Sequence, residues 1–316
     1  MLFSERREVQ MWLGVDGGGT KTTFALYDDD MRPLDAFDRG TSHIGQIGAE
    51  AMRSMLVEGF CEAGLRGLAD VRGIGFGIAG FGEGASDDAR IRAIVTDAAA
   101  GLPFELVNDV QAALAASLDL AEGIVIVAGT GSIAYGERGG VGMRCGGWDY
   151  QIGDEGSGYW MGKQLVRAFS LQSDGRRPRG ALHRIVRQEL ELSRDLDLIA
   201  YMRDVIGHDR TRTAALSVLV SRAAMEGDPD ARDIFRRAAA EEARMVEVIA
   251  DALFGEKHPA GEAIPVSYVG GTFKAGELIL NPLAEQLPSR CRLVAPIREA
   301  ASGACLLLRR RLSRCG

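Results

Sequence analysis

The chain has 316 residues, of which 46% are hydrophobic and 26% charged, and its net charge is −7. This length accommodates two domains with separate cores, and the composition is that of a globular protein in solution. The negative charge disfavours nucleic acid or an anionic membrane as a partner, and no apolar run approaches the ~20 residues of a membrane-spanning helix.

The cysteines at positions 61, 145, 291, 305 and 315 are scattered and lack any CxxC spacing. This pattern predicts reduced thiols rather than a disulfide scaffold or a zinc site. The opening residues, MLFSERREVQ, are charged and lack the apolar core of a signal peptide. We therefore expect a cytoplasmic protein.

The segment LGVDGGGTKTTFALYD, residues 13–28, predicts two strands joined by a glycine turn. Glycines permit positive φ angles and close approach of a ligand, and the amide groups of such a turn can converge on an anion. The candidate phosphate-binding residues are Gly17, Gly18, Gly19, Thr20 and Lys21. Asp16 ends the first strand, where a carboxylate could hold a hydrated magnesium ion. Glycine-rich hairpin turns also occur for structural reasons alone.

Further elements of this first half are strands near residues 33–37 and 71–78, and helices over 46–65 and 87–100. Gly75, Gly77 and Gly80 match the GxGxxG dinucleotide fingerprint. That fingerprint requires glycines in the turn after a strand, whereas apolar alternation here runs through Gly75 and Gly77. The glycines are therefore expected inside the strand, which disfavours a Rossmann site.

A strand over Phe104–Val107 is followed by Asn108, Asp109 and a helix that extends to Leu118. An aspartate at this point is a common helix N-cap. Catalytic carboxylates also lie at the carboxyl ends of strands in open sheets. Both interpretations of Asp109 are kept.

EGIVIVAGTGSIAYG, residues 122–136, repeats the plan of the opening hairpin about 110 residues later, with its turn at Gly129, Thr130 and Gly131. Two such hairpins, each opening one half of the chain, predict an internal duplication whose halves face a shared cleft. The string GxxxxGK[ST] is absent, so the chain is not a P-loop protein.

The next segment, GGWDYQIGDEGSGYW, places glycines, a tryptophan and carboxylates in one loop before a helix over residues 159–169. Asp154 and Glu155 could cap that helix. The same composition suits a sugar, because carboxylates accept hydrogen bonds from hydroxyl groups and an indole covers a pyranose face.

The remaining elements are a loop over residues 170–179, a mostly helical region over 181–254, strands over 264–269 and 292–295, and helices over 276–287 and 297–312. Gly270, Gly271 and Thr272 follow the first of these strands. Their bare backbone could lie against a flat ring, although tight packing alone would also explain the glycines.

In order, these motifs are DGGGTKT, an aspartate after a strand, AGTGS and VGGTFKAG. The set resembles the superfamily of actin, the heat-shock chaperones and sugar kinases. GTSH and GGWDYQIGDEGSGYWMG narrow the resemblance to the N-acetylglucosamine kinase-like branch of the BadF/BadG/BcrA/BcrD ATPase family. The resemblance spans Gly14 to about Leu308.

The resemblance implies an ATP-dependent kinase that phosphorylates the 6-hydroxyl of N-acetylglucosamine. Asp109 would be the general base, Thr20 and Thr130 with their neighbouring glycines would hold the ATP phosphates, and Asp16 would anchor Mg²⁺. The positions that match sugar contacts are Ser42, His43, Asp109, Ser132, Gly147, Trp148, Asp149 and Asp154, and those that match the adenosine loop are Gly270, Gly271 and Thr272.

Two departures from the family pattern leave undecided whether the sugar is N-acetylglucosamine or glucosamine. Ser42 stands where the kinases commonly have asparagine, and Asp149-Tyr150 replaces the frequent Gly-His. Asp149 could pair with a 2-ammonium group, which would favour glucosamine, or it could point to solvent.

Two other classes are considered beside the amino-sugar kinase. An activator ATPase of a CoA-ester dehydratase or reductase would need two cysteines per subunit for a shared iron–sulfur cluster. Only Cys145 lies near the appropriate region. A sugar-sensing regulator would carry a DNA-binding domain before the first hairpin, and only ~12 residues precede Leu13.

The expected fold is α/β: a two-lobed, actin-like ATPase with duplicated ribonuclease H-like halves and the active site in the interlobe cleft. The predicted N-terminal lobe is residues 1–118, with the C-terminal helix, residues 297–316, packed back on it. The predicted C-terminal lobe is residues 119–296. A homodimer is expected from the family.

Overall fold

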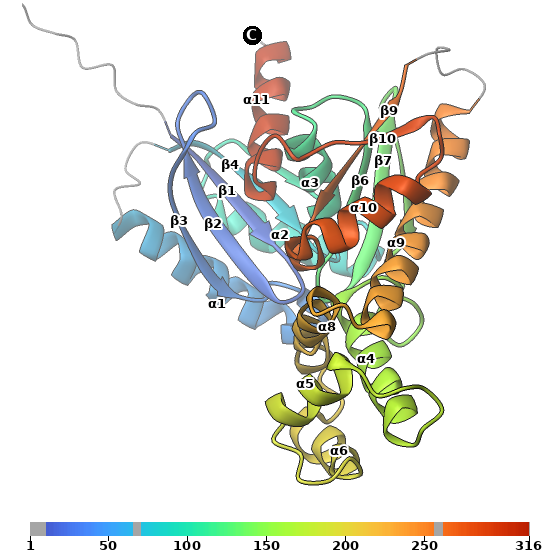
Figure 1. Cartoon of the computed structure of the whole chain (residues 1–316). Helices are drawn as coiled ribbons and strands as arrows, with labels where there is room; N and C mark the ends of the chain where they lie inside the picture. Colours follow the sequence, from blue (N-terminus) through green and yellow to red (C-terminus); the bar gives the residue numbers. More distant parts are fainter. Residues whose placement is uncertain (1–10, 66–70, 256–261, 316) are drawn as a thin grey trace, which may run out of the picture. The chain divides into compact units, whose positions relative to one another are not determined.

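A computed structural model of the chain describes residues 11–65, 71–255 and 262–315. The chain divides into two compact units, one formed by residues 1–121 together with 296–316 and the other by residues 122–295. Figure 1 shows the elements of each unit, coloured along the sequence. None of the helices in the described ranges is long and apolar enough to cross a membrane.

The first unit contains a five-stranded sheet in the order β3-β2-β1-β4-β5. The strands are β1 (Met11–Gly17), β2 (Lys21–Tyr27), β3 (Pro33–Gly40), β4 (Val71–Ile78) and β5 (Phe104–Val107). The helices are α1 (Ile44–Leu65), α2 (Ala85–Ala98), α3 (Asp109–Ser117) and α11 (Gly303–Cys315), with a 3-10 turn, η5 (Ala300–Ser302), before α11. The first three strands are antiparallel, and β4 and β5 continue the sheet in parallel with β1.

Alternating side chains of β1 supply two separate cores, one on each face of this sheet. Leu13 and Val15 are buried in the core that includes Met52 of α1 and Ile91 of α2. Trp12, on the opposite face, is buried in the core that includes residues of α11. Since successive residues of a strand point to opposite faces, β1 forms the centre of a sheet that is covered on both sides.

Glycines in two strands let the C-terminal segment of the chain approach the sheet backbone. A Cβ atom on Gly14 would lie 2.0 Å from the carbonyl oxygen of Ala301, and one on Gly75 would lie 2.2 Å from the backbone nitrogen of Cys305. Gly75 pairs with Gly14 inside the β1–β4 ladder. The expectation that the GxGxxG match lies within a strand is therefore confirmed for Gly75 and Gly77.

The final helix starts later than the sequence predicts. Residues 297–299 are not helical: the Ile297 amide donates to the carbonyl oxygen of Ser117 at 3.0 Å, and Arg298 forms an ion pair with Asp119 at 2.9 Å. These contacts fix an extended approach, and α11 begins only at Gly303. Gly316, the end of the predicted helix, lies outside the described residues.

The second unit has a five-stranded sheet in the order β10-β9-β6-β7-β8, which is the order of the first sheet read from the other edge. Its strands are β6 (Gly123–Ala128), β7 (Ser132–Arg138), β8 (Val141–Gly146), β9 (Ile264–Val269) and β10 (Cys291–Leu293). Three antiparallel strands are again followed by two parallel ones. The predicted α/β fold with an internal duplication is confirmed.

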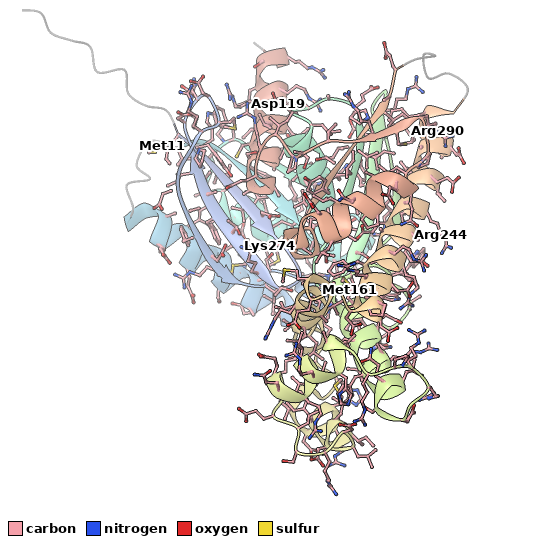
Figure 2. All side chains as sticks on the ribbon, in the orientation of Figure 1. Met11, Asp119, Met161, Arg244, Lys274 and Arg290 are labelled. Carbon is pink, nitrogen blue, oxygen red and sulfur yellow. The ribbon has the colours of Figure 1, made fainter. Side chains whose placement is uncertain are left out.

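The helices of the second unit pack on its sheet and on one another. They are α4 (Gly158–Ser173), α5 (Ala181–Glu189), α6 (Asp197–Tyr201), α7 (Arg210–Ala215), α8 (Ser217–Met225), α9 (Pro229–Ile249) and α10 (Glu277–Gln286), with π-helical turns η2 (Met202–Ile206) and η3 (Ala250–Phe254) and a 3-10 turn η4 (Gly271–Ala275). Ile126 of the sheet, Phe169 of α4 and Phe235 of α9 are buried in one core. Arg244 of α9, labelled in Figure 2, is largely exposed and forms an ion pair with Glu241.

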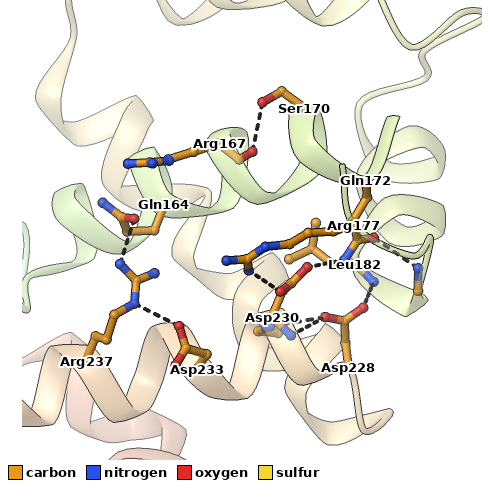
Figure 3. A network of polar contacts seen from close by, with 12 residues as sticks. Gln164, Arg167, Ser170, Gln172, Arg177, Leu182, Asp228, Asp230, Asp233 and Arg237 are labelled. Carbon is orange, nitrogen blue, oxygen red and sulfur yellow. Dashed lines mark hydrogen bonds and ion pairs between the residues drawn. The ribbon is translucent and has the colours of Figure 1, made fainter. Parts of the chain in front are cut away.

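A polar network joins α4 and the first turn of α5 to the start of α9 (Figure 3). Asp228 caps α9 by accepting hydrogen bonds from the amides of Asp230 and Ala231, and it also accepts one from the Leu182 amide at 2.8 Å. Gln172 donates to Asp230 at 2.7 Å. The predicted loop over residues 170–179 is wrong at its start, since α4 continues through Ser173.

We predict that Gly75→Ala lowers the free energy of unfolding by about 2–3 kcal/mol, because its methyl group would overlap backbone atoms of the C-terminal segment, which cannot rotate away. Urea unfolding followed by circular dichroism measures the change. The matched control is Gly40→Ala, since no atom lies within 4 Å of a Cβ there, and its effect should stay within about 0.5 kcal/mol. Equal stability of the two variants would contradict the prediction.

Candidate functional site

Asp109 is the first residue of α3, and the residue before it caps the helix. The Asn108 side chain accepts a hydrogen bond from the Val110 amide at 3.1 Å, and the Gln111 side-chain oxygen accepts one from the Asn108 amide at 3.2 Å. Asn108 also donates to the carbonyl oxygen of Phe81 at 2.6 Å. Because this capping box is complete without it, Asp109 is not the N-cap, and the interpretation of this residue as a cap alone is wrong.

Asp16 and Asp109 lie at the same end of the first sheet. Asp16 pairs with Gly77 in the β1–β4 ladder, and Gly77 pairs with Val107, two residues before Asp109. A Cβ atom on Gly77 would lie 2.8 Å from the Ala112 Cβ and 3.5 Å from the Asp109 Cα. The absence of a side chain at position 77 therefore brings the first turn of α3 close to the sheet.

Both carboxyl groups have raised pKa values. Burial raises the pKa of Asp109 to about 7, with a further contribution from the negative charge of Asp16. Burial also raises the pKa of Asp16 to about 6, against the opposing influence of the Lys21 ammonium. A carboxylate with a pKa near neutrality is suited to accept a proton during a reaction.

The first glycine turn packs against the loop that carries Ser42 and His43. A Cβ atom on Gly17 would lie 2.2 Å from the Ser42 Oγ, and Thr41 donates to the Gly18 carbonyl oxygen at 3.0 Å. Ser42 Oγ and His43 Nδ1 are buried and have no hydrogen-bond partner among the residues that the structure describes. Buried polar atoms of this kind need a partner, which a bound hydroxyl-bearing ligand would supply.

The remaining residues of this turn differ in their surroundings. Gly18 and Gly19 are partly exposed and Thr20 is exposed. Lys21 extends from β2, where its ammonium lies 2.8 Å from the Asp38 carboxylate. The predicted phosphate-binding cation thus has a carboxylate partner on the neighbouring strand.

In the second unit, the other glycine turn is bonded to the start of α4. The Gly129 carbonyl oxygen accepts from the Gly158 amide at 2.8 Å, and the Thr130 carbonyl oxygen from the Tyr159 amide at 3.3 Å. Ser157, not Asp154 or Glu155, caps the helix by accepting from the Trp160 amide. The capping interpretation of the two acidic residues is therefore wrong.

Asp154 lies against this turn. It is buried, accepts a hydrogen bond from the Ser132 amide at 3.3 Å, and lies 2.6 Å from where a Cβ atom of Gly131 would be. Ser132 Oγ donates to the Glu155 carbonyl oxygen at 2.7 Å. Burial raises the pKa of Asp154. The second glycine turn therefore packs against the loop that carries Asp149, Asp154 and Glu155, which we call the acidic loop.

The loop from Gly146 to Gly156 contains several residues with positive φ. They are Gly146, Gly147, Asp149, Asp154 and Gly156. Two aspartates in this conformation are notable, because it is unfavourable for residues with side chains and is concentrated at functional sites. Trp148, directly before Asp149, is 67% exposed, so its indole face is open to a ligand.

The segment Gly270, Gly271 and Thr272 lies beside the second glycine turn. Val127 and Val269 pair in parallel, so both segments leave the same end of the sheet. Gly270 has a φ of +121°, and a Cβ there would lie 2.2 Å from the Ala128 carbonyl oxygen, which makes glycine necessary. No atom lies within 4 Å of a Cβ at Gly271, which leaves its backbone accessible.

No cluster of three or more metal-ligating side chains occurs within the described ranges. A single carboxylate such as that of Asp16 can hold Mg²⁺ when water and substrate phosphates complete the coordination shell. The negative charge of Asp16 contributes to the raised pKa of Asp109, and a cation held by Asp16 would offset that charge.

Two residues near these loops were not found from the sequence. Arg210 lies beside Asp149 and Asp154 in space, and it belongs to no motif. Glu242 is fully buried on α9, with its Cγ 3.1 Å from where a Cβ of Gly156 would be. Glu242 could have been found from the sequence, because it is a charged residue on the apolar face of α9. No local sequence pattern indicates a role for Arg210.

Two duplicated α/β units, each with a glycine turn between its first two strands, define a protein of the actin-like ATPase and sugar-kinase class. The model of the BadF/BadG/BcrA/BcrD ATPase family matches residues 13–307. The chain belongs to this family, as the sequence motifs predicted.

Known proteins similar to this chain include two curated kinases. N-acetylmuramic acid/N-acetylglucosamine kinase of Clostridium acetobutylicum is 31% identical over 250 residues, which are 76% of this chain and 79% of that protein. N-acetyl-D-glucosamine kinase of Dictyostelium discoideum is 26% identical over 292 residues, 88% of this chain and 90% of that protein. A solved structure from Chromobacterium violaceum, provisionally assigned as an N-acetylglucosamine kinase, has a TM-score of 0.70 and 30% identity, and the match covers 95% of this chain and 99% of that one.

We predict that Asn108→Ala lowers the free energy of unfolding by about 1–2 kcal/mol, because it removes the cap of α3 and the hydrogen bond to Phe81. Asn108→Ser, which keeps an acceptor for the Val110 amide, should lose less. Thermal and urea unfolding of the two variants make the comparison. An alanine variant as stable as the parent protein would refute this account of the cap.

Proposed function

We propose that this protein transfers the γ-phosphate of ATP to the 6-hydroxyl of an amino sugar, and that the sugar is N-acetylglucosamine. Family membership and the two curated kinases support this function. The observation that carries it is the Asp109 carboxyl group, which is not the N-cap of α3, accepts a hydrogen bond from the Val110 amide at 3.0 Å through one oxygen, and has a pKa of about 7. Its position at the carboxyl end of a strand suits a catalytic base.

In the proposed mechanism, Asp109 accepts the proton of the sugar 6-hydroxyl as that oxygen attacks the γ-phosphorus. The bond from phosphorus to the β–γ bridging oxygen breaks, and ADP leaves with the negative charge. Phosphoryl transfer of this kind depends chiefly on positioning and charge neutralisation. Mg²⁺, held through water by Asp16, would neutralise charge on the phosphate oxygens.

The other residues of the two units would bind the substrates. For ATP these are Thr20 and Lys21 with Gly17, Gly18 and Gly19, Thr130 with Gly129 and Gly131, and the adenosine loop Gly270, Gly271 and Thr272. For the sugar they are Ser42, His43, Ser132, Gly147, Trp148, Asp149 and Asp154. The orphaned Ser42 and His43 atoms support this assignment, since sugar hydroxyl groups would complete their hydrogen bonds.

The activator ATPase is disfavoured by the cysteines of the second unit. Cys145 lies on β8 and Cys291 on β10, which are the opposite edges of a five-stranded sheet. Two ligands for a shared cluster would have to lie together. The homodimer and the cytoplasmic location stay predictions of the family resemblance.

A coupled assay of ADP release with ATP and Mg²⁺ tests the function. It compares N-acetylglucosamine, glucosamine, glucose, N-acetylmuramic acid and a sugar-free control. We expect turnover that depends on an amino sugar and is highest with N-acetylglucosamine. Slow ATP hydrolysis that no sugar changes would instead favour the activator ATPase.

Asp109→Asn should lower kcat by at least roughly a hundredfold, because the amide cannot accept the hydroxyl proton, while the KM for ATP changes little. Asp119→Asn, near the other end of α3, is the matched control, because its carboxylate pairs with Arg298 instead. Steady-state kinetics of both variants measure the difference. An asparagine variant with normal kcat would exclude Asp109 as the base.

The pH dependence follows from the raised pKa of Asp109. Below about pH 7 the carboxyl group is protonated and cannot act as a base, so kcat/KM should rise with pH up to that value and then level off. Asp16→Asn should move the midpoint of this rise to lower pH, since the charge of Asp16 raises the pKa of Asp109. A flat kcat/KM profile through this range would contradict the assignment.

A further inference from the structure

Arg210 joins two carboxylates that the proposed function assigns to the sugar. Its guanidinium Nη1 lies 3.3 Å from an Asp149 carboxylate oxygen, and Nη2 lies 3.7 Å from an Asp154 carboxylate oxygen. A Cβ on Gly131 would lie 3.0 Å from Nη2. Arg210 therefore adjoins both the acidic loop and the second glycine turn.

The surrounding residues hold this side chain in place. Arg210 is the first residue of α7, which Asp209 caps by accepting hydrogen bonds from two amides. Its guanidinium carbon lies 5.5 Å from the centre of the Tyr150 ring, and Tyr150 makes an edge-to-face contact with Tyr159. Cation–π contact with a ring that is itself packed restricts the guanidinium to the vicinity of Asp149.

Arg210 also has hydrogen-bonding capacity that the chain leaves unused. Its Nε is buried and has no hydrogen-bond partner within the described ranges. A guanidinium is always charged and presents five N–H donors. Uncharged carbonyl oxygens or carboxylates are suitable acceptors for these donors, and an ammonium group is not.

The ion pair changes what Asp149 can recognise. A free Asp149 carboxylate would attract the 2-ammonium group of glucosamine. The Arg210 cation, 3.3 Å away, offsets part of that attraction, and an ammonium beside the pair would also be repelled by the guanidinium. The 2-acetamido group of an N-acylated sugar carries no charge and so avoids this repulsion.

We propose that Arg210 is a specificity-determining residue that makes the site select N-acylated amino sugars over sugars with a free ammonium group. The inference rests on the proposed kinase function. In this assignment Asp149 stands at the sugar as one half of the ion pair with Arg210, and not as a separate partner for an ammonium group.

The test compares kcat/KM for N-acetylglucosamine and for glucosamine in the parent protein and in Arg210→Met, which keeps the length of the side chain and removes its charge. We expect the ratio of glucosamine to N-acetylglucosamine to rise roughly tenfold in Arg210→Met, as for a like charge removed from a partly buried position. The matched control is Arg212→Met on the same helix, whose side chain contacts Asp209 and Val205 instead. Its ratio should not change.

Asp149→Asn completes a double-mutant cycle. If Arg210 acts by neutralising Asp149, the gain from Arg210→Met should be largely lost when Asp149 is already asparagine. Binding of each sugar, measured by calorimetry without nucleotide, should show the same pattern and identifies variants that have lost their fold.

The outcomes separate the two proposals. Absence of turnover with every amino sugar in the parent protein would overturn the proposed function and this inference with it. Turnover of N-acetylglucosamine with a sugar ratio that Arg210→Met leaves unchanged would overturn the inference alone. The same conclusion would follow from equal ratios in Arg210→Met and Arg212→Met.

Discussion

Close contact between the first turn of α3 and β4 is the constraint on which the acidic end of the first sheet depends. It exists because Gly77 has no side chain, which leaves room for Ala112 and brings the backbone of Asp109 near the strand. Asn108 then fixes the start of the helix through its cap and its bond to Phe81. Proximity to Asp16 and burial follow from this placement, and they raise the pKa of the carboxyl group. The raised pKa of Asp109 is thus a consequence of how the backbone packs.

In the second unit, too, a residue other than the candidate carboxylate caps the helix that follows. A serine, Ser157, caps α4, so the neighbouring acidic side chain of Asp154 is available for the glycine turn and for Arg210. In both units the N-cap is a polar residue other than the candidate carboxylate: Asn108 precedes Asp109 directly, and Ser157 follows Asp154 by three residues. The carboxylates consequently keep oxygens that the fold does not use, which is a physical condition for binding or catalysis at a helix terminus.

The sequence predicted the elements whose pattern is local. The strands Gly123–Ala128 and Ile264–Val269 are largely apolar runs with several buried residues, and each glycine turn is a local cluster of glycines in the sequence. The strand β8 was missed because most of its residues are exposed or only partly buried. The Arg210–Asp149 pair joins residues 61 positions apart, so no local pattern encodes it. The sequence alone cannot decide whether Asn108 or Asp109 caps α3, because both residue types are common N-caps. The structure shows that the cap is Asn108.

The position of α11 has a consequence for the order in which the two units fold during synthesis. The first unit is built from two separate stretches of sequence, with the whole second unit between them. Its sheet carries bare glycine backbone at Gly14 and Gly75, where the C-terminal segment packs, and Trp12 is buried in the core that includes this segment. On the ribosome, the second unit is therefore complete before the first, whose core stays open on one face until α11 emerges. The N-terminal stretch of the first unit is translated first, and it finishes folding last.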